Sequence, residues 1–370
     1  MAGWDADFSD DSHATVARQR LEADIASILR PSIVNKYAII VGPGGTGKST
    51  AVRKVVHALI AEGAGGAGAG VAHFSTRELL ADFSQDLARA VGYRTPINFL
   101  DRMRRYITGE IKEQAAPPLQ RYEPRASWSP LSRLLMSAAK LHKARHGRAP
   151  TLVLDAMDVI AKKDAAFFGE VQEFAKACAD GGILRVVFIF SDGDALPPLL
   201  SSSAESRCDK DQIYEVGDIS DNDAIKFVAS RYGKSEALAR ELVETITGGR
   251  FTLLQSYGKT AKPLAAIRQV LDIETNLRLK AAGVRPTHPL FKALSLAAAS
   301  AGIHNDAAAE MLELSKISAL LRLNILAVHP DGTYTFNSRR VEARIREALE
   351  YEQQQREAEE AAAQARRRWW

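Results

Sequence analysis

A glycine-rich segment that ends in a lysine and hydroxyl residues is the part of the sequence best suited to chemistry. Residues 42–49, GPGGTGKS, fit the pattern G-x-x-x-x-G-K-[ST] at every fixed position, between an apolar run and a helical pattern. Glycines at this spacing let backbone N–H groups turn around phosphate oxygens, and a helix that begins there adds partial positive charge. The pattern predicts a nucleoside triphosphate site formed by Gly42, Pro43, Gly44, Gly45, Thr46, Gly47, Lys48, Ser49 and Thr50.

Three side chains have predicted roles toward the triphosphate and a metal ion. We expect Lys48 to reach the β- and γ-phosphates and the Ser49 hydroxyl to ligate Mg²⁺. Asp155 ends the apolar run TLVLD, and a carboxylate at the end of a strand beside a phosphate-binding loop is placed to hold the hydration shell of Mg²⁺. The sequence therefore predicts Ser49 and Asp155 as the metal-site residues.

Three further residues are candidates for catalysis, each with an alternative role. Asp158 is the only acidic group near enough in sequence to polarise the attacking water, and a helix N-cap is its alternative role. Ser191 follows the run LRVVFIF, where its hydroxyl could sense the γ-phosphate or simply cap the strand end. Arg207 could serve a neighbouring subunit as an arginine finger, or be a solvated surface residue.

The elements that would position these residues alternate along the first part of the chain. Short apolar runs are separated by helical patterns, which favours a parallel sheet covered on both faces, a three-layer α/β/α fold. The runs are YAIIV (37–41), VAHF (71–74), TLVLD (151–155), LRVVFIF (184–190) and IYEV (213–216).

Composition changes divide the chain into five predicted parts. They are an N-terminal helix or arm (1–35), a core with the apolar runs (36–217), an all-helical segment (218–280), helices followed by a hairpin around Asp331-Gly332 (285–346), and a polar C-terminal helix (347–370). The basic and aromatic stretch 94–130 resembles an insertion, which could contact nucleic acid or a partner, or be a solvated loop.

Charge and composition exclude several classes of protein. The 49 Lys and Arg against 45 Asp and Glu leave +4, too little for wholesale neutralisation of a nucleic acid backbone. With 46% hydrophobic residues and no run of 18 apolar residues, we expect neither a mostly disordered chain nor a membrane span. Four aspartates among the first 13 residues have the wrong sign for a signal or transit peptide. We therefore expect an intracellular protein, cytoplasmic or nuclear.

Taken together, these motifs resemble the AAA+/STAND superfamily of P-loop ATPases, and within it the archaeal-ATPase-like family that also has fungal members. The resemblance covers about residues 20–346. It rests on GPGGTGKST (42–50), TLVLDAMD (151–158), TGGRF (247–251) and ILAVHPDGTYTFNSRRVEARIRE (325–347). It implies a P-loop NTPase core, an α-helical lid that contains TGGRF, and a winged-helix-like domain at the C-terminal end.

The sequence departs from the family's pattern at three positions. Ala156 stands where many hydrolysing relatives have Glu, Val159 where an acidic residue usually follows the second Asp, and Phe251 where the lid has proline. These departures bear on the catalytic base, and so on hydrolysis more than on binding.

We expect an ATP-binding protein, a Mg²⁺-dependent ATPase that acts as a nucleotide-controlled switch or assembly. No guanine-reading motif follows the fourth run, which favours ATP. A slowly hydrolysing or non-hydrolysing interaction module and an initiator-like DNA-binding ATPase are the alternatives. Residues 339–346 hold a basic cluster that could track phosphates, yet residues 339–370 contain eight Arg and seven Glu, which favours packing within the protein or against a partner. A homo-oligomer through Arg207 and an unidentified protein partner complete the expectations.

Overall fold

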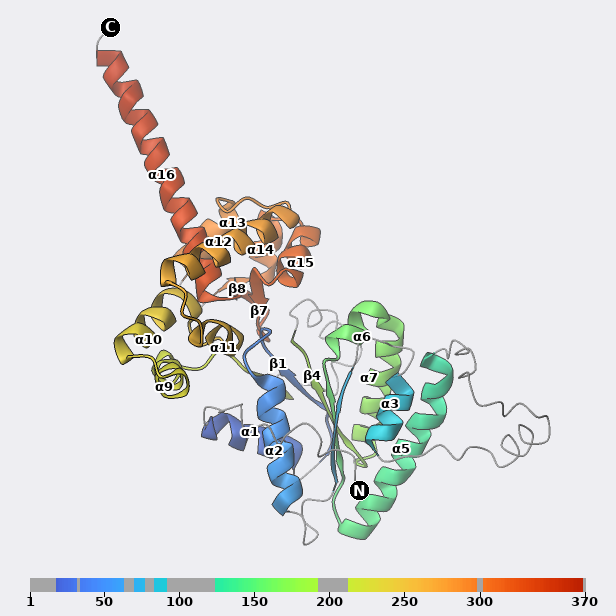
Figure 1. Cartoon of the computed structure of the whole chain (residues 1–370). Helices are drawn as coiled ribbons and strands as arrows, with labels where there is room; N and C mark the ends of the chain where they lie inside the picture. The colour runs from blue at the N-terminus through green and yellow to red at the C-terminus, as the bar shows by residue number, and fades with distance from the viewer. Residues whose placement is uncertain are drawn as a thin grey trace, which may run out of the picture.

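The computed structural model describes residues 18–31, 34–62, 70–76, 83–91, 124–191, 212–297 and 302–368. Two sequence predictions fall outside these ranges, namely Arg207 and most of the insertion-like stretch 94–130. The described chain builds a parallel sheet between helices, then a group of helices, then a smaller C-terminal unit that ends in one long helix (Figure 1).

Five parallel strands form the central sheet in the order β2-β3-β4-β1-β5. The strands are β1 (Ala38–Val41), β2 (Val71–Ser75), β3 (Thr151–Asp155), β4 (Arg185–Ile189) and β5 (Ile213–Glu215). Each lies within one residue of its predicted apolar run, so the predicted parallel sheet is confirmed. Because β1 lies between β4 and β5, the loop after β1 emerges at the sheet's carboxyl edge between two strands, where α/β folds bind ligands.

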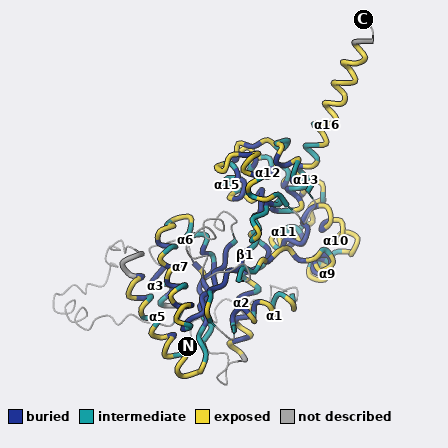
Figure 2. Tube along the Cα trace, turned by 180° about the vertical axis from the view of Figure 1, so that it is seen from behind, coloured by how far each residue is buried: buried dark blue, intermediate teal, exposed yellow. Residues whose placement is uncertain are grey.

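Helices cover both faces of this sheet, because its strands are apolar on both sides. Helices α1 (Gln19–Leu29) and α2 (Lys48–Glu62) cover the face that carries Ile40, Val153 and Val187. Helices α3 (Phe83–Ala90), α5 (Pro124–His146) and α7 (Ala165–Asp180) cover the opposite face. The buried strands between exposed helix surfaces are visible in Figure 2, and the three-layer α/β/α arrangement is confirmed.

The helices that follow β5 form a separate core. They are α9 (Asp221–Tyr232), α10 (Glu236–Leu242), a π-helical turn η6 (Val243–Thr247), α11 (Phe251–Gly258) and α12 (Leu264–Ala281). Ser220 and Ser235 cap α9 and α10 by accepting main-chain N–H groups. We call α9 to α11 the lid helices. Helix α12 contributes to their core through Ile267 and Leu271 and to the next core through Leu279.

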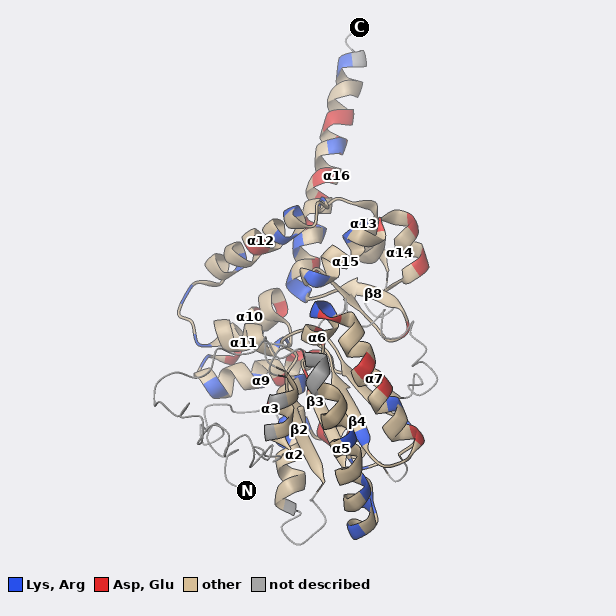
Figure 3. Ribbon diagram, turned by 90° about the vertical axis from the view of Figure 1, so that its right-hand side faces the viewer, with Lys and Arg blue, Asp and Glu red and all other residues tan. Residues whose placement is uncertain are grey.

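The C-terminal unit combines helices with a small antiparallel sheet of order β6-β8-β7. Its elements are α13 (Pro289–Leu296), β6 (Ile303–His304), α14 (Asn305–Met311), α15 (Leu314–Arg322), β7 (Leu326–Val328), β8 (Thr333–Phe336) and α16 (Arg339–Arg368). The predicted turn at Asp331-Gly332 joins β7 and β8, with Asp331 accepting the N–H of Thr333 at 2.9 Å. Helix α16 runs without interruption past residue 346 and extends beyond the rest of the unit (Figures 1 and 3).

None of the helices in the described ranges combines the length and the apolarity that crossing a membrane requires.

Candidate phosphate-binding site

The predicted phosphate-binding loop lies between β1 and α2, where its glycines meet real conformational demands. Gly45 and Gly47 have φ values of 83° and 88°, in the left-handed region that favours glycine. A Cβ on Gly42 would collide with the carbonyl oxygen of Val216, and one on Gly45 with the side chain of Thr252. Glycine is therefore required here both for the turn and for the close approach of other segments.

Lys48 points back onto the loop rather than toward a carboxylate. Its side chain is 2% exposed, and Nζ donates to the carbonyl oxygens of Gly42 at 2.7 Å and Pro43 at 2.8 Å. Burial, and then the positive charge of Arg250, lower the pKa of Lys48 to about 8, against the opposing pull of three aspartates. Lys48 is thus a desolvated ammonium group at the start of a helix, which an anionic ligand would stabilise.

Ser49 and Asp155, predicted as the metal-site residues, are brought together by the fold. The Ser49 hydroxyl donates to Asp155 Oδ1 at 3.0 Å, although 106 residues separate them. Asp155 is buried, and Oδ1 also accepts the N–H of Ala156 at 2.8 Å. A hydroxyl and a carboxylate are hard oxygen donors of the type that Mg²⁺ prefers, so this pair fits the predicted ion.

The sequence did not identify His73, a buried β2 residue on the other side of this carboxylate. Its Nε2 lies 3.4 Å from Asp155 Oδ2, and within the described residues Nε2 has no hydrogen-bond partner. Only the pairing of β2 with β3 reveals this proximity, because the spacing of His73 along the chain matches no metal-ligand pattern.

Asp158 and Ser191 also meet, but through the main chain of Ser191. Asp158 Oδ1 accepts the Ser191 N–H at 3.2 Å, which ties the end of β3 to the end of β4. Asp158 is the first residue of α6 (Asp158–Lys163), and Met157 occupies the N-cap position. Ala156 has a φ of 59°, an unusual value for a residue with a Cβ, at the sharp turn between Asp155 and α6.

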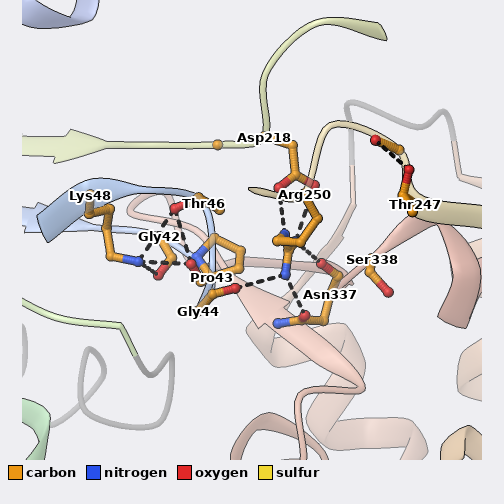
Figure 4. A network of polar contacts seen from close by, with 12 residues as sticks. Gly42, Pro43, Gly44, Thr46, Lys48, Asp218, Thr247, Arg250, Asn337 and Ser338 are labelled. Atoms are coloured by element: carbon orange, nitrogen blue, oxygen red, sulfur yellow. Dashed lines mark hydrogen bonds and ion pairs between the residues drawn. The ribbon is translucent and has the colours of Figure 1, made fainter. Parts of the chain in front are cut away.

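The start of lid helix α11 packs directly on the phosphate-binding loop. Arg250, immediately before α11, donates from Nη1 to the carbonyl oxygen of Gly44 at 3.1 Å, and the Thr252 N–H donates to that of Gly45 at 3.3 Å. Arg250 also forms a two-pronged ion pair with Asp218, in the segment that leaves β5. Figure 4 shows Lys48 and Arg250 on either side of the stretch from Gly42 to Gly44.

The same arginine reaches the C-terminal unit. Its Nη1 donates to Asn337 Oδ1 at 3.1 Å and its Nη2 to the main-chain oxygen of Asn337, just before α16 (Figure 4). The Arg250 side chain is 7% exposed, so these contacts are largely shielded from water. Sequence reasoning placed Arg250 in the TGGRF element without assigning it a role, and Asp218 and Asn337 were missed.

A third contact comes from the N-terminal side. Arg18, directly before α1, donates to the carbonyl oxygens of Thr46 and Gly217, both at 3.1 Å. Partial burial lowers the pKa of Arg18, while the aspartates Asp218 and Asp223 raise it. The loop is therefore held by segments from the N-terminal side, the lid and, through Arg250, the C-terminal unit.

The basic cluster after the hairpin, predicted as a possible phosphate-tracking surface, is paired with acidic side chains. Arg339 bonds Asp221 at 2.8 Å, and Arg340 bonds Asp272 and Glu347. Arg344 and Arg346 likewise lie 4.0 Å from Glu347 and 2.7 Å from Glu342. Basic and acidic residues are interspersed along α16 (Figure 3). The structure thus favours the alternative that this cluster packs within the protein.

Comparison with known proteins supports the fold assignment. No protein-family model matches the sequence, and no curated protein sequence matches it. Among solved structures, the chain is similar to the Walker-type ATPase paby2304 of Pyrococcus abyssi, with 14% identity, 90% of this chain and 96% of that chain covered, and a TM-score of 0.53. The Aeropyrum pernix ORC2 protein in its ADP form (13% identity, 90% and 95% covered) and ORC1 protein in complex with DNA (15%, 92% and 95%) give TM-scores of 0.48 and 0.46.

The sheet order, the loop and this similarity define the class of fold. The chain has a P-loop-type α/β/α fold similar to that of the Walker-type ATPase paby2304, as the sequence resemblance implied for the fold.

Proposed function

We propose that this chain is an ATP-binding protein, a Mg²⁺-dependent ATPase that works as a nucleotide-controlled switch. One observation carries the proposal: a phosphate-binding loop with a desolvated lysine is in direct contact with the lid helices and, through Arg250, with the C-terminal unit. A ligand that changes the conformation of this loop would therefore also affect the lid helices and the C-terminal unit.

The residues of the loop have complementary roles in the proposed activity. Lys48 would exchange its carbonyl partners for the β- and γ-phosphates, with a gain because an ammonium–phosphate contact is charge-assisted on both sides. Ser49 and Asp155 would hold Mg²⁺, which supplies charge neutralisation at the phosphate oxygens. Gly42 to Thr50 would bind the phosphates through their backbone, as the motif predicts.

For the hydrolytic step there is an alternative proposal, in which ATP is bound but hydrolysed slowly. Asp158 is the nearest candidate base, and its Oδ1 is engaged by the Ser191 N–H. Position 156, directly after the metal-site aspartate, is an alanine without an ionisable group. These two facts favour slow turnover, so a slowly hydrolysing ATP-binding interaction module is the second candidate function.

The switch is proposed to operate through Arg250. In the described structure the lid already contacts the loop, since Arg250 and Thr252 bond the carbonyl oxygens of Gly44 and Gly45. We infer that nucleotide stabilises this packed arrangement and that Asn337 conveys it to the hairpin and α16. A role of Arg207 as an arginine finger in a homo-oligomer stays a prediction.

The proposal is tested by ATP binding and phosphate release with Lys48→Ala. The variant should lose about 100-fold or more in ATP affinity, because it removes the cation in contact with the phosphates. Lys54→Ala is the matched control, since Lys54 lies on the same helix but is exposed and paired with Glu22 at 2.6 Å. Circular dichroism would verify that both variants fold.

The outcomes separate the two candidate functions. Phosphate release that depends on Mg²⁺ and disappears with Lys48→Ala supports the ATPase. Tight ATP binding without release of ADP over hours supports the interaction module. Equal ATP affinity for wild type and Lys48→Ala would refute both. Light scattering with and without ATP and Mg²⁺ would at the same time test the predicted oligomer.

A further inference from the structure

His73 is a buried polar side chain that has no role in the proposed function. The residue is 7% exposed on β2, and within the described part of the chain its Nε2 makes no hydrogen bond. A buried polar atom without a partner destabilises the folded state, so a hydrocarbon side chain would serve packing better. The position therefore calls for a reason other than packing.

Strand register explains where His73 points. His73 pairs with Val153 across the parallel β2–β3 ladder, and side chains directly opposite each other lie on the same face of a sheet. Asp155 is two residues beyond Val153 and shares that face, the one covered by α2. The imidazole consequently lies beside the Asp155 carboxylate, with Nε2 3.4 Å from Oδ2 but not hydrogen-bonded to it.

The two oxygens of Asp155 thus face different groups. Oδ1 accepts from the Ser49 hydroxyl and from the Ala156 N–H, whereas Oδ2 faces His73. A hydrogen bond from His73 Nε2 to Oδ2 would hold the carboxylate on both sides and restrict its rotation about the Cβ–Cγ bond. Such outer contacts orient metal-site carboxylates and raise metal affinity, and their removal typically costs about 10–100-fold.

We propose that His73 is a positioning residue of the magnesium site: when Ser49 and Asp155 hold the ion, the imidazole closes the 3.4 Å gap, donates from Nε2 to Asp155 Oδ2 and fixes the carboxylate plane. This inference rests on the proposed function, because it presupposes that the loop binds a Mg²⁺–nucleotide complex. His73 does not touch the phosphates, so its effect is confined to the metal-dependent part of binding.

The test compares nucleotide affinity in excess chelator with affinity across a Mg²⁺ titration, by calorimetry with ADP and with ATP. His73→Gln places an amide nitrogen where Nε2 lies, whereas His73→Asn is one methylene shorter and falls short of Oδ2. His73→Phe keeps a buried ring without any donor. His57→Phe, at an exposed position of α2, controls for the substitution itself.

We expect wild type, His73→Gln and His57→Phe to need the same Mg²⁺ concentration for half-maximal enhancement of affinity. His73→Asn and His73→Phe should need about 10-fold more, with the affinity in chelator unchanged. If His73→Phe does not fold, the Gln and Asn pair still decides, because both keep a polar amide.

Three results would overturn the inference, and they are distinct from one another. An unchanged Mg²⁺ requirement in folded His73→Asn or His73→Phe removes His73 from the metal site but leaves the proposed function intact. An equal loss of affinity with and without Mg²⁺ shows a general structural role. Wild type that binds no nucleotide in either condition refutes the proposed function and the inference with it.

Discussion

Lys48 and Arg340 are two cations that the structure buries almost equally, at 2% and 3% exposure, and surrounds in opposite ways. Lys48 donates to the carbonyl oxygens of Gly42 and Pro43. Arg340 instead donates to the carboxylates of Asp272 and Glu347. Lys48 thus has only neutral oxygen atoms as hydrogen-bond acceptors, whereas the charge of Arg340 is neutralised by carboxylates.

The difference separates a binding residue from a packing residue. Because its hydrogen bonds go to neutral oxygens, burial lowers the pKa of Lys48 to about 8, and an arriving anion would reverse that effect. The charge of Arg340 is already compensated and has little to offer a phosphate. Two basic residues that look alike in the sequence thus have different roles.

The largest expected effect is a loss of stability when Arg340 is replaced, because Arg340 is assigned to packing and Lys48 to binding. Arg340→Met should lower the free energy of unfolding by about 2 kcal/mol, because it leaves Asp272 without its cation and takes one of three arginines from Glu347, which keeps Arg268 and Arg344. ATP affinity should stay within about twofold of wild type. Urea denaturation and calorimetry measure the two quantities. Arg356→Met, which breaks the exposed pair with Glu352 on the same helix, is the control and should change stability by less than about 0.5 kcal/mol. Loss of ATP affinity with unchanged stability in Arg340→Met would contradict the assignment of Arg340 as a packing residue.

A smaller effect follows from the pKa of Lys48. Phosphate binding favours the charged lysine, so the lysine takes up a proton on binding once the pH exceeds its lowered pKa of about 8. ATP affinity should therefore fall by about tenfold between about pH 7 and pH 9. Calorimetry in two buffers of different ionisation enthalpy would detect the proton uptake. In Lys48→Arg, whose guanidinium stays charged, the remaining affinity should not follow this pH dependence. Flat affinity in wild type without proton uptake would contradict the assignment.

The smallest expected effect concerns a contact between the central sheet and the C-terminal unit. His329, after β7, bonds Glu215 of β5 at 2.6 Å, and this hydrogen bond raises the pKa of His329 above its ordinary value of 6.5. A raised pKa in the folded state means that the contribution to stability is complete below pH 6.5 and is lost as pH rises through the higher folded value. His329→Gln should thus be most destabilising at mildly acidic pH, as measured by urea midpoints across pH. His304→Gln controls for loss of an exposed histidine. A stability difference that grows with rising pH would be inconsistent with this contact.

The sheet and the loop could be predicted because their signals are local. Each strand is a continuous apolar run, and the residues from Gly42 to Ser49 carry the loop's chemistry within one segment. The link of Ser49 to Asp155 followed because both lie at the same edge of a parallel sheet. Strand β6, with two residues, is too short to give a periodic signal and was not predicted.

The remaining features depend on contacts between distant positions. Arg250 and Gly44 are 206 residues apart, and Arg339 and Asp221 are 118 apart, so neither pairing can be read from local spacing. His73 reaches Asp155 only because β2 and β3 are neighbours in one particular register. Charge counting along residues 339–346 could not distinguish a free basic surface from a paired one, because Asp221 and Asp272 come from other helices.

The contact of Arg250 with both the loop and Asn337 is the central claim, and hydrogen–deuterium exchange tests it most directly. With ATP and Mg²⁺, backbone amides of residues 251–258 and 333–345 should exchange more slowly in wild type. Asn337→Ala removes the Oδ1 acceptor but keeps the main-chain oxygen, so it should keep the protection of 251–258 and reduce that of 333–345, whereas Asn337→Asp, which retains a side-chain acceptor for Arg250, should keep both. Unchanged exchange at 333–345 in nucleotide-bound wild type, or equal protection there in Asn337→Ala, would contradict the proposed switch.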